Sequence, residues 1–222
     1  IPVHVLLDAS ASMAAPESDR KFGFAVKLAA AVAYVALGNN EPVRVTTIRA
    51  NGDGPVLEES PLLRHHGRYL RLKPFLGSLA PSGGTALADG VRRYLGRHAE
   101  GGMAFLVSDF LVDDSVYEEA LTKLRARRLD VWAIHVVGRR ERDLEGLRGR
   151  MRLRDAETGA FREVTVGEAD RRRYRRDFEE RVTRLRQFCH RGGIGHAVAF
   201  AELGVERNLV GGFATEGMLR LR

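Results

Sequence analysis

The stretch that decides the fold is IPVHVLLDASASMA, residues 1–14. Its first half is short, aliphatic and β-branched at the start, which is typical of a strand buried on both faces. The run ends at Asp8, and Ser10 and Ser12 follow at alternate positions. Oxygen-bearing side chains at this spacing can converge in a tight loop and suit a hard cation. The same string also suits a polar turn after a core strand, so further ligands must decide between these two interpretations.

A second apolar run ends in the same way. Residues 103–107 are apolar and lead directly into Ser108 and Asp109. Before that run, Gly83 and Gly84 predict a tight loop whose backbone can approach a ligand closely. Thr85 then stands at the start of an expected helix, where its hydroxyl is either a ligand or a helix cap.

Strands and helices alternate along most of the chain. Strands are expected at 1–8, 43–48, 103–109, 129–137 and 196–200, and helices at 21–37, 67–79, 86–97, 115–127, 169–191 and 202–212. Ser18 or Asp19 is expected to cap the first helix. This alternation predicts an α/β fold with a doubly wound, mostly parallel sheet and helices on both faces. Residues 56–60 are expected to form one antiparallel edge strand, and about 150–167 an inserted β-hairpin outside the sheet.

In a doubly wound sheet, ligands bind in the crevice at the carboxyl ends of adjacent strands. Asp8 and Asp109 are expected to end the two strands that flank this crevice, and the loop before Thr85 can lie over it. The predicted metal-binding residues are Asp8, Ser10, Ser12, Thr85 and Asp109. Two carboxylates and three hydroxyls make a small octahedral oxygen site, which Mg²⁺ prefers.

Composition sets limits on the rest. The chain has 222 residues, 44% of them hydrophobic, which suits one domain spanning 1–222. A single cysteine, Cys189, excludes an internal disulfide framework and fits a reducing compartment. Since no run of about 18 apolar residues exists, no membrane span is expected in this piece. The chain begins at Ile1 inside a core strand, so it is expected to be a fragment of a longer protein.

The net charge of +7 comes mainly from arginine, and helix 169–191 is the most basic stretch. Such a charge could serve an acidic partner or nucleic acid. The aromatic residues of that helix lie on its apolar stripe, not among the arginines, so nucleic-acid binding is not favoured. An arginine bias with solvated helix faces is the preferred interpretation.

Three stretches resemble the metal-ion-dependent adhesion site of the von Willebrand factor A domain. They are Asp8-Ala9-Ser10-Ala11-Ser12-Met13, Gly83-Gly84-Thr85 and Ser108-Asp109. The chain also resembles a bacterial group labelled domain of unknown function fifty-eight. This resemblance rests on the sequence of residues 8–13, on Ser108-Asp109-Phe110 and on the stretch 153–159.

The resemblance implies a binding domain and not an enzyme. In that family the residues matching Ser10, Ser12 and Thr85 would hold Mg²⁺ directly, with Mn²⁺ or Ca²⁺ as substitutes, while Asp8 and Asp109 often act through water. An acidic side chain from a protein partner would complete the site. Genes of the group often lie beside those of MoxR-type AAA+ ATPases, which implies an adaptor or assembly role, with a cytoplasmic location expected.

The main alternative is a Mg²⁺-dependent phosphatase of the haloacid-dehalogenase type, which also carries an aspartate at the end of its first strand. In such enzymes a second aspartate, the general acid, normally follows two residues later. Here that position is Ser10, so the proton donor for the leaving group is missing. Mg²⁺ binding without hydrolysis of a phosphomonoester would separate the two functions.

Overall fold

A six-stranded sheet lies at the centre of the computed structural model, which describes residues 1–144 and 146–209. The strand order is β3-β2-β1-β4-β5-β8, and only β3 runs antiparallel to its neighbour. The strands are β1 (Val3–Asp8), β2 (Val43–Asn51), β3 (Gly54–Glu59), β4 (Gly102–Ser108), β5 (Leu129–Val137) and β8 (Gly195–Phe200). The expected doubly wound, mostly parallel sheet with one antiparallel edge strand is therefore confirmed.

β1 lies in the middle of this sheet, between β2 and β4. All six of its residues are buried, which explains why its sequence is aliphatic on both faces. Val3, Val5 and Leu7 contribute to one core cluster, and Leu6 contributes to the other. Because β4 is parallel to β1, the carboxyl ends of both strands lie at the same edge of the sheet.

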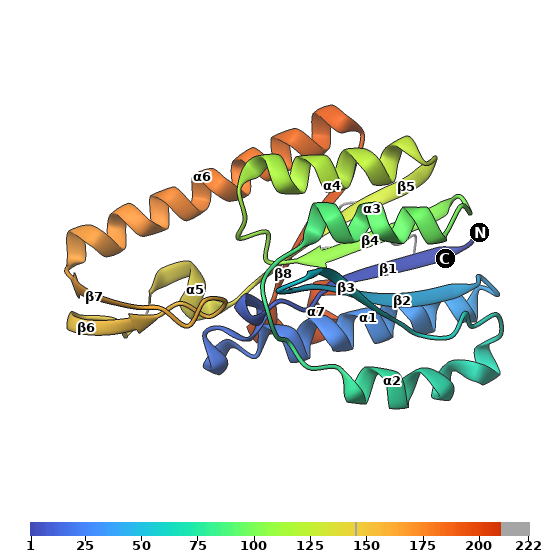
Figure 1. Ribbon diagram of the computed structural model, residues 1–222, viewed down its shortest axis with the longest axis horizontal. Helices are drawn as coiled ribbons and strands as arrows, with labels where there is room; N and C mark the ends of the chain where they lie inside the picture. Colours follow the sequence, from blue (N-terminus) through green and yellow to red (C-terminus); the bar gives the residue numbers. More distant parts are fainter. Residues whose placement is uncertain (145, 210–222) are drawn as a thin grey trace.

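Helices cover both faces of the sheet (Figure 1). On one face lie α1 (Lys21–Gly38) and α2 (Leu72–Ser78), which follows a 3₁₀ turn at His66–Arg71. On the other face lie α3 (Leu87–Arg97), α4 (Asp114–Ala126) and α6 (Glu168–Gly192). The apolar stripe expected on α6 buries Phe178, Leu185 and Cys189, so the stripe serves packing.

One described segment, Glu17–Gly38, is long and apolar enough to cross a membrane by length and composition. The sequence analysis expected no membrane span, and this segment, which contains Lys21 and Lys27, meets only the criterion of length and composition. Half of the apolar 18-residue stretch within this segment is buried inside the protein. Its helical part, α1, packs Phe24, Leu28 and Leu37 into the core on one face of the sheet. A core helix of this kind is as long and as apolar as a membrane-spanning helix.

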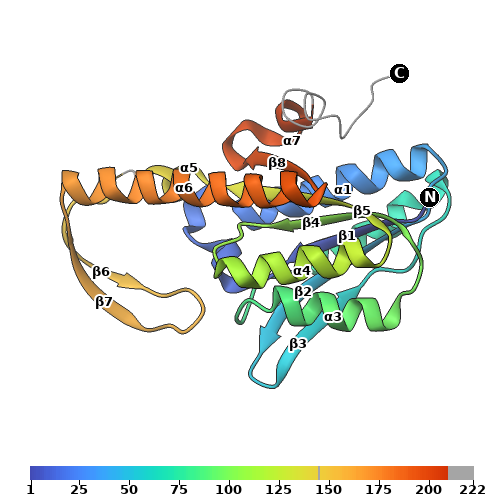
Figure 2. The ribbon, with the colours of Figure 1, turned by 90° about the horizontal axis from the view of Figure 1, so that it is seen from above.

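The inserted hairpin is confirmed as a separate two-stranded sheet, formed by β6 (Gly149–Arg154) and β7 (Phe161–Val166). It follows the short helix α5 (Arg139–Asp143) and leads into α6. Most of its residues are exposed. The two views show the hairpin beside the main body, with its tip turned back toward the carboxyl ends of the central strands (Figures 1 and 2).

Several boundaries differ from the sequence prediction. β2 extends to Asn51 because it pairs with β3 along its whole second half. Neither Ser18 nor Asp19 caps α1, whose N-cap residue is Arg20 in a left-handed conformation. The Asp19 carboxylate instead accepts hydrogen bonds from backbone nitrogens of α5. Near the C-terminus the described chain forms a 3₁₀ turn (Ala201–Leu203) and α7 (Gly204–Arg207), and residues 210–212 of the expected last helix lie outside the described residues.

Candidate metal centre

Three loops that are distant in sequence meet at the carboxyl ends of β1 and β4. The Ala11 backbone nitrogen donates to the Gly83 carbonyl at 3.0 Å, and the Ser82 nitrogen donates to the Ala9 carbonyl at 2.9 Å. The Ser108 hydroxyl donates to Asp8 Oδ2 at 2.6 Å. These bonds join the loop after β1 to the glycine loop before α3 and to the end of β4.

The serines after β1 are organised by Asp8, which is buried. Asp8 Oδ1 accepts hydrogen bonds from the Ser10 backbone nitrogen at 3.0 Å and from the Ser10 hydroxyl at 2.7 Å. Ser10 Oγ lies 2.9 Å from Ser12 Oγ. Because the Ser10 hydrogen points at Asp8, a lone pair of Ser10 Oγ remains available to a cation. Asp8, Ser10 and Ser12 are therefore brought into one cluster.

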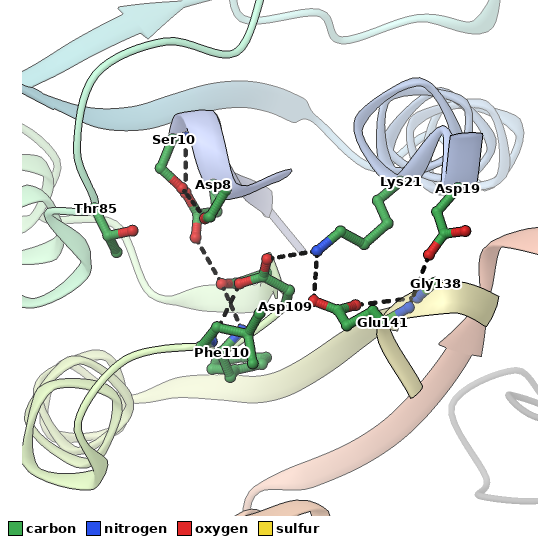
Figure 3. Close-up of polar contacts among 12 residues, drawn as sticks. Asp8, Ser10, Asp19, Lys21, Thr85, Asp109, Phe110, Gly138 and Glu141 are labelled. Carbon is green, nitrogen blue, oxygen red and sulfur yellow. Dashed lines mark hydrogen bonds and ion pairs between the residues drawn. The ribbon is translucent and has the colours of Figure 1, made fainter. Parts of the chain in front are cut away.

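Asp109 follows the last residue of β4 and lies beside Asp8 (Figure 3). Its Oδ1 accepts a hydrogen bond from the Leu111 nitrogen at 3.1 Å, and the Ser108 hydroxyl accepts one from the Phe110 nitrogen at 3.0 Å. Phe110 has a φ of 50°, and this tight turn directs Asp109 to the site. Both acids thus have both carboxylate oxygens hydrogen-bonded to this chain, which suits roles behind the direct ligands.

Lys21 is a member of this group that the sequence analysis missed. Its ammonium is fully buried and donates to Asp109 Oδ2 at 2.8 Å and to Glu141 Oε1 at 2.6 Å. Glu141 Oε2 in turn accepts from the Gly138 nitrogen at 3.2 Å. Although burial lowers the pKa of Lys21, the carboxylates of Asp109 and Glu141 outweigh burial and raise it. Lys21 therefore stays charged and ties Asp109 to the start of α5.

The group holds more carboxyl groups than ammonium groups. Asp8, Asp109 and Glu141 are all buried, and the Lys21 ammonium contacts two of them, Asp109 and Glu141. Burial, and then the charge of Asp109, raise the pKa of Asp8 to about 6. A divalent cation would relieve this repulsion. The available donors are all oxygen atoms, so the residues present fit Mg²⁺ or a similar hard ion.

Thr85 lies on the neighbouring loop, and its side chain faces Asp8 and Ser10 (Figure 3). It does not cap α3, whose N-cap residue is Ala86. Gly83 is required by space, since a Cβ there would collide with the Ala50 carbonyl oxygen. The Ala50 nitrogen also donates to the Gly84 carbonyl at 2.6 Å. Close packing against the end of β2 therefore fixes the loop that carries Thr85.

The Thr85 hydroxyl is engaged by a residue that the sequence analysis did not consider. Thr85 Oγ1 donates to Glu157 Oε1 at 2.6 Å, and the Thr85 nitrogen donates to Glu157 Oε2 at 3.2 Å. Glu157 belongs to the turn between β6 and β7. The stretch 153–159 had been noted only for its resemblance to a bacterial group, and nothing local in it indicates contact with Thr85.

All five predicted ligands thus lie on the three joined loops, and their role toward a metal stays a prediction. Among residues 1–144 and 146–209, no group of three or more His, Cys, Asp or Glu side chains is arranged to hold a metal ion. The proposed site differs from such groups because three of its five ligands are hydroxyls.

Comparison with known families gave one match that covers most of the chain. The model of the family described as "Protein of unknown function DUF58" matches residues 2–187. This confirms the resemblance to the bacterial group noted from the sequence. No curated protein matches the chain.

Solved structures similar to this chain include the conserved hypothetical protein BatB from Bacteroides thetaiotaomicron, at 18% identity and a TM-score of 0.49, covering 81% of this chain and 87% of that chain. A von Willebrand factor type A structure from Catenulispora acidiphila has 16% identity and a TM-score of 0.44, covering 61% and 33%. The manganese-loaded TRAP protein of Plasmodium vivax has 15% identity and a TM-score of 0.45, covering 63% and 57%.

Proposed function

Since the chain belongs to the family described as protein of unknown function DUF58, whose description assigns no activity, we propose a function from the site itself. The chain is a divalent-cation-dependent protein–protein interaction domain. Ser10, Ser12 and Thr85 hold the ion, and Asp8 and Asp109 act behind them. The observation that carries the proposal is the convergence of three hydrogen-bonded loops on one oxygen-lined point at the carboxyl ends of β1 and β4.

The chemistry of the ligands favours recognition over turnover. Both carboxylates are occupied by hydrogen bonds from this chain. With neutral hydroxyls as its direct ligands, a bound Mg²⁺ would keep much of its positive charge and attract an additional carboxylate oxygen. A partner that presents an aspartate or glutamate side chain would supply that oxygen. The protein's own residues then position the ion, and the partner's carboxylate takes a further coordination position.

The resemblance to the bacterial group supports a more specific role. Gene neighbourhoods of that group point to a MoxR-type AAA+ ATPase as the partner, with this chain as an adaptor or assembly factor. An ATPase of that kind is cytoplasmic, so we place the domain in the same compartment. Mg²⁺ is the proposed ion, and Mn²⁺ or Ca²⁺ offer similar oxygen chemistry.

Titration calorimetry with MgCl₂ tests the metal dependence. The parent is expected to bind one ion per chain, and Asp8→Asn to reduce the affinity at least tenfold. The asparagine keeps the shape of the buried side chain but removes its charge. Asp130→Asn is the matched control, because Asp130 is exposed near the amino end of β5, at the opposite edge of the sheet. Equal affinity in Asp8→Asn and the parent would refute the proposal.

The same proteins test the phosphatase alternative. A haloacid-dehalogenase-type enzyme requires a general acid two residues after its nucleophile, and here the Ser10 hydroxyl donates to Asp8. We expect the Mg²⁺-loaded parent to release no phosphate from p-nitrophenyl phosphate above the rate of Asp8→Asn. Hydrolysis that depends on Asp8 would favour the enzyme.

A further inference from the structure

Glu157 places a carboxylate on Thr85, one of the three proposed direct ligands of the ion. Its two oxygens accept hydrogen bonds from the hydroxyl and the backbone nitrogen of Thr85. We propose that Glu157 is an internal acidic ligand of the centre, which occupies the partner's position until the β6–β7 hairpin moves away. This inference rests on the proposed function, because it assigns to Glu157 the position that a partner's carboxylate would take.

The turn that carries Glu157 is shaped by its own hydrogen bonds. Asp155 Oδ1 accepts from the Glu157 nitrogen at 3.0 Å, the Thr158 nitrogen at 2.7 Å and the Thr158 hydroxyl at 2.8 Å. Gly159 adopts a φ of 71°, a conformation that favours glycine. The turn therefore presents the Glu157 side chain from a preorganised backbone, which lowers the entropic cost of placing its carboxylate on Thr85.

The hairpin behind this turn is only lightly attached to the body. β6 and β7 pair with each other and with none of the other described strands. Most of their residues are exposed, and Figure 2 shows the hairpin projecting beside the sheet with only its tip turned inward. A segment with so little buried surface opens at low free-energy cost. The contact between Glu157 and Thr85 can thus break without unfolding the domain.

Tethering makes Glu157 a competitor of moderate strength. A group held by a short segment of the same chain acts at an effective concentration of about millimolar. It would exclude weak or accidental acids but yield to a partner with further contacts. If the site were open in about a tenth of the molecules, the apparent affinity for a partner would fall about tenfold.

The hydration of a bound Mn²⁺ ion tests this inference. Mn²⁺ takes oxygen ligands as Mg²⁺ does, and the water-proton relaxation rate of its complex reports how many exchangeable waters remain on it. We expect Glu157→Gln to gain one exchangeable water relative to the parent, because water replaces the lost carboxylate. The matched control is Glu163→Gln, which removes the same charge from β7 at an exposed position paired with Arg150, and it should behave as the parent.

The outcomes separate the inference from the proposed function. If Mn²⁺ binds in an Asp8-dependent way and the parent, Glu157→Gln and Glu163→Gln carry equal numbers of waters, the inference is wrong while the metal centre stands. If both glutamine variants gain a water, the gain comes from removing a negative charge anywhere on the hairpin, and the assignment to Glu157 is also wrong. If the parent binds no Mn²⁺, or Asp8→Asn binds it equally well, the proposed function and the inference fail together.

Discussion

Lys21 shows how a single residue sets the electrostatics of the centre. It is the first residue of an apolar helix, and its ammonium is fully enclosed between Asp109 and Glu141. A buried lysine persists only when it is paired and hydrogen-bonded. Its bond to Asp109 Oδ2 holds that carboxylate beside Asp8, so the lysine positions a predicted metal-binding residue without being a ligand itself.

Removal of this ammonium should be costly. Lys21→Met would leave two buried carboxylates without their cation, and we expect the free energy of unfolding to fall by about 3–5 kcal/mol. Lys27→Met is the control, because Lys27 is exposed on the same helix and should change stability by no more than about 0.5 kcal/mol. Urea unfolding at neutral pH measures both. Similar small losses in the two variants would contradict the account of Lys21.

His196 gives a prediction on pH at the same scale. Burial, and then the charge of Arg186, lower the pKa of His196 to about 4 from its ordinary value of 6.5. Between these values the unfolded chain binds a proton that the folded chain does not. The stability that the neutral ring contributes is therefore complete above the unfolded pKa and is lost as the pH falls toward the folded pKa.

His196→Leu removes this titration. The Nε2 atom of His196 has no hydrogen-bond partner among the described residues, so its loss leaves no other polar group there unpaired. Between pH 7 and about pH 4.5 the variant should lose less unfolding free energy than the parent, by on the order of 2 kcal/mol. Urea unfolding at a series of pH values gives the comparison. Parallel pH profiles for the two proteins would show that His196 does not contribute.

At the scale of elements, α3 depends on a close approach to the sheet. A Cβ at Gly90 would clash with the Cγ2 atom of Ile48, which is buried in β2, whereas a Cβ at Gly96 of the same helix meets nothing within 4 Å. α3 follows the loop that carries Thr85, so its distance from the sheet also helps to set the position of that loop.

The two glycines should respond in opposite directions to the same substitution. Gly90→Ala is expected to lower the free energy of unfolding by about 1–3 kcal/mol, because overpacking outweighs the better helix propensity of alanine. Gly96→Ala should raise it by about 0.5–1 kcal/mol. Denaturant unfolding of the two variants measures both changes. If both substitutions stabilised the protein, the packing of α3 on Ile48 would be looser than described.

The elements were largely predictable because their patterns are strong. β5 was expected at 129–137 and forms there, and the helix expected at 21–37 is α1. Boundaries that depend on distant partners were not predictable from local sequence. Asp19 looked like the cap of α1, yet its partners are backbone nitrogens of α5, more than a hundred positions away. Local propensity contains no information about such a partner.

At the scale of the whole molecule, topology brought the predicted site together. Two strand ends in a doubly wound sheet must share an edge, so Asp8 and Asp109 could be paired from the sequence. The contacts of Lys21 with Glu141 and of Thr85 with Glu157 could not, because they depend on how α5 and the hairpin fold back onto that edge. The additions to the simple sheet therefore supply the features that distinguish this centre.

The most direct measurement of the central claim is an anomalous difference map from crystals of the protein soaked in MnCl₂. The account predicts one strong peak between Ser10 Oγ, Ser12 Oγ and Thr85 Oγ1, at about 2.0–2.2 Å from its direct ligands, close to the distances of Mg²⁺ sites. A map with no peak at that point, obtained at a concentration at which the protein binds Mn²⁺ in solution, would contradict it.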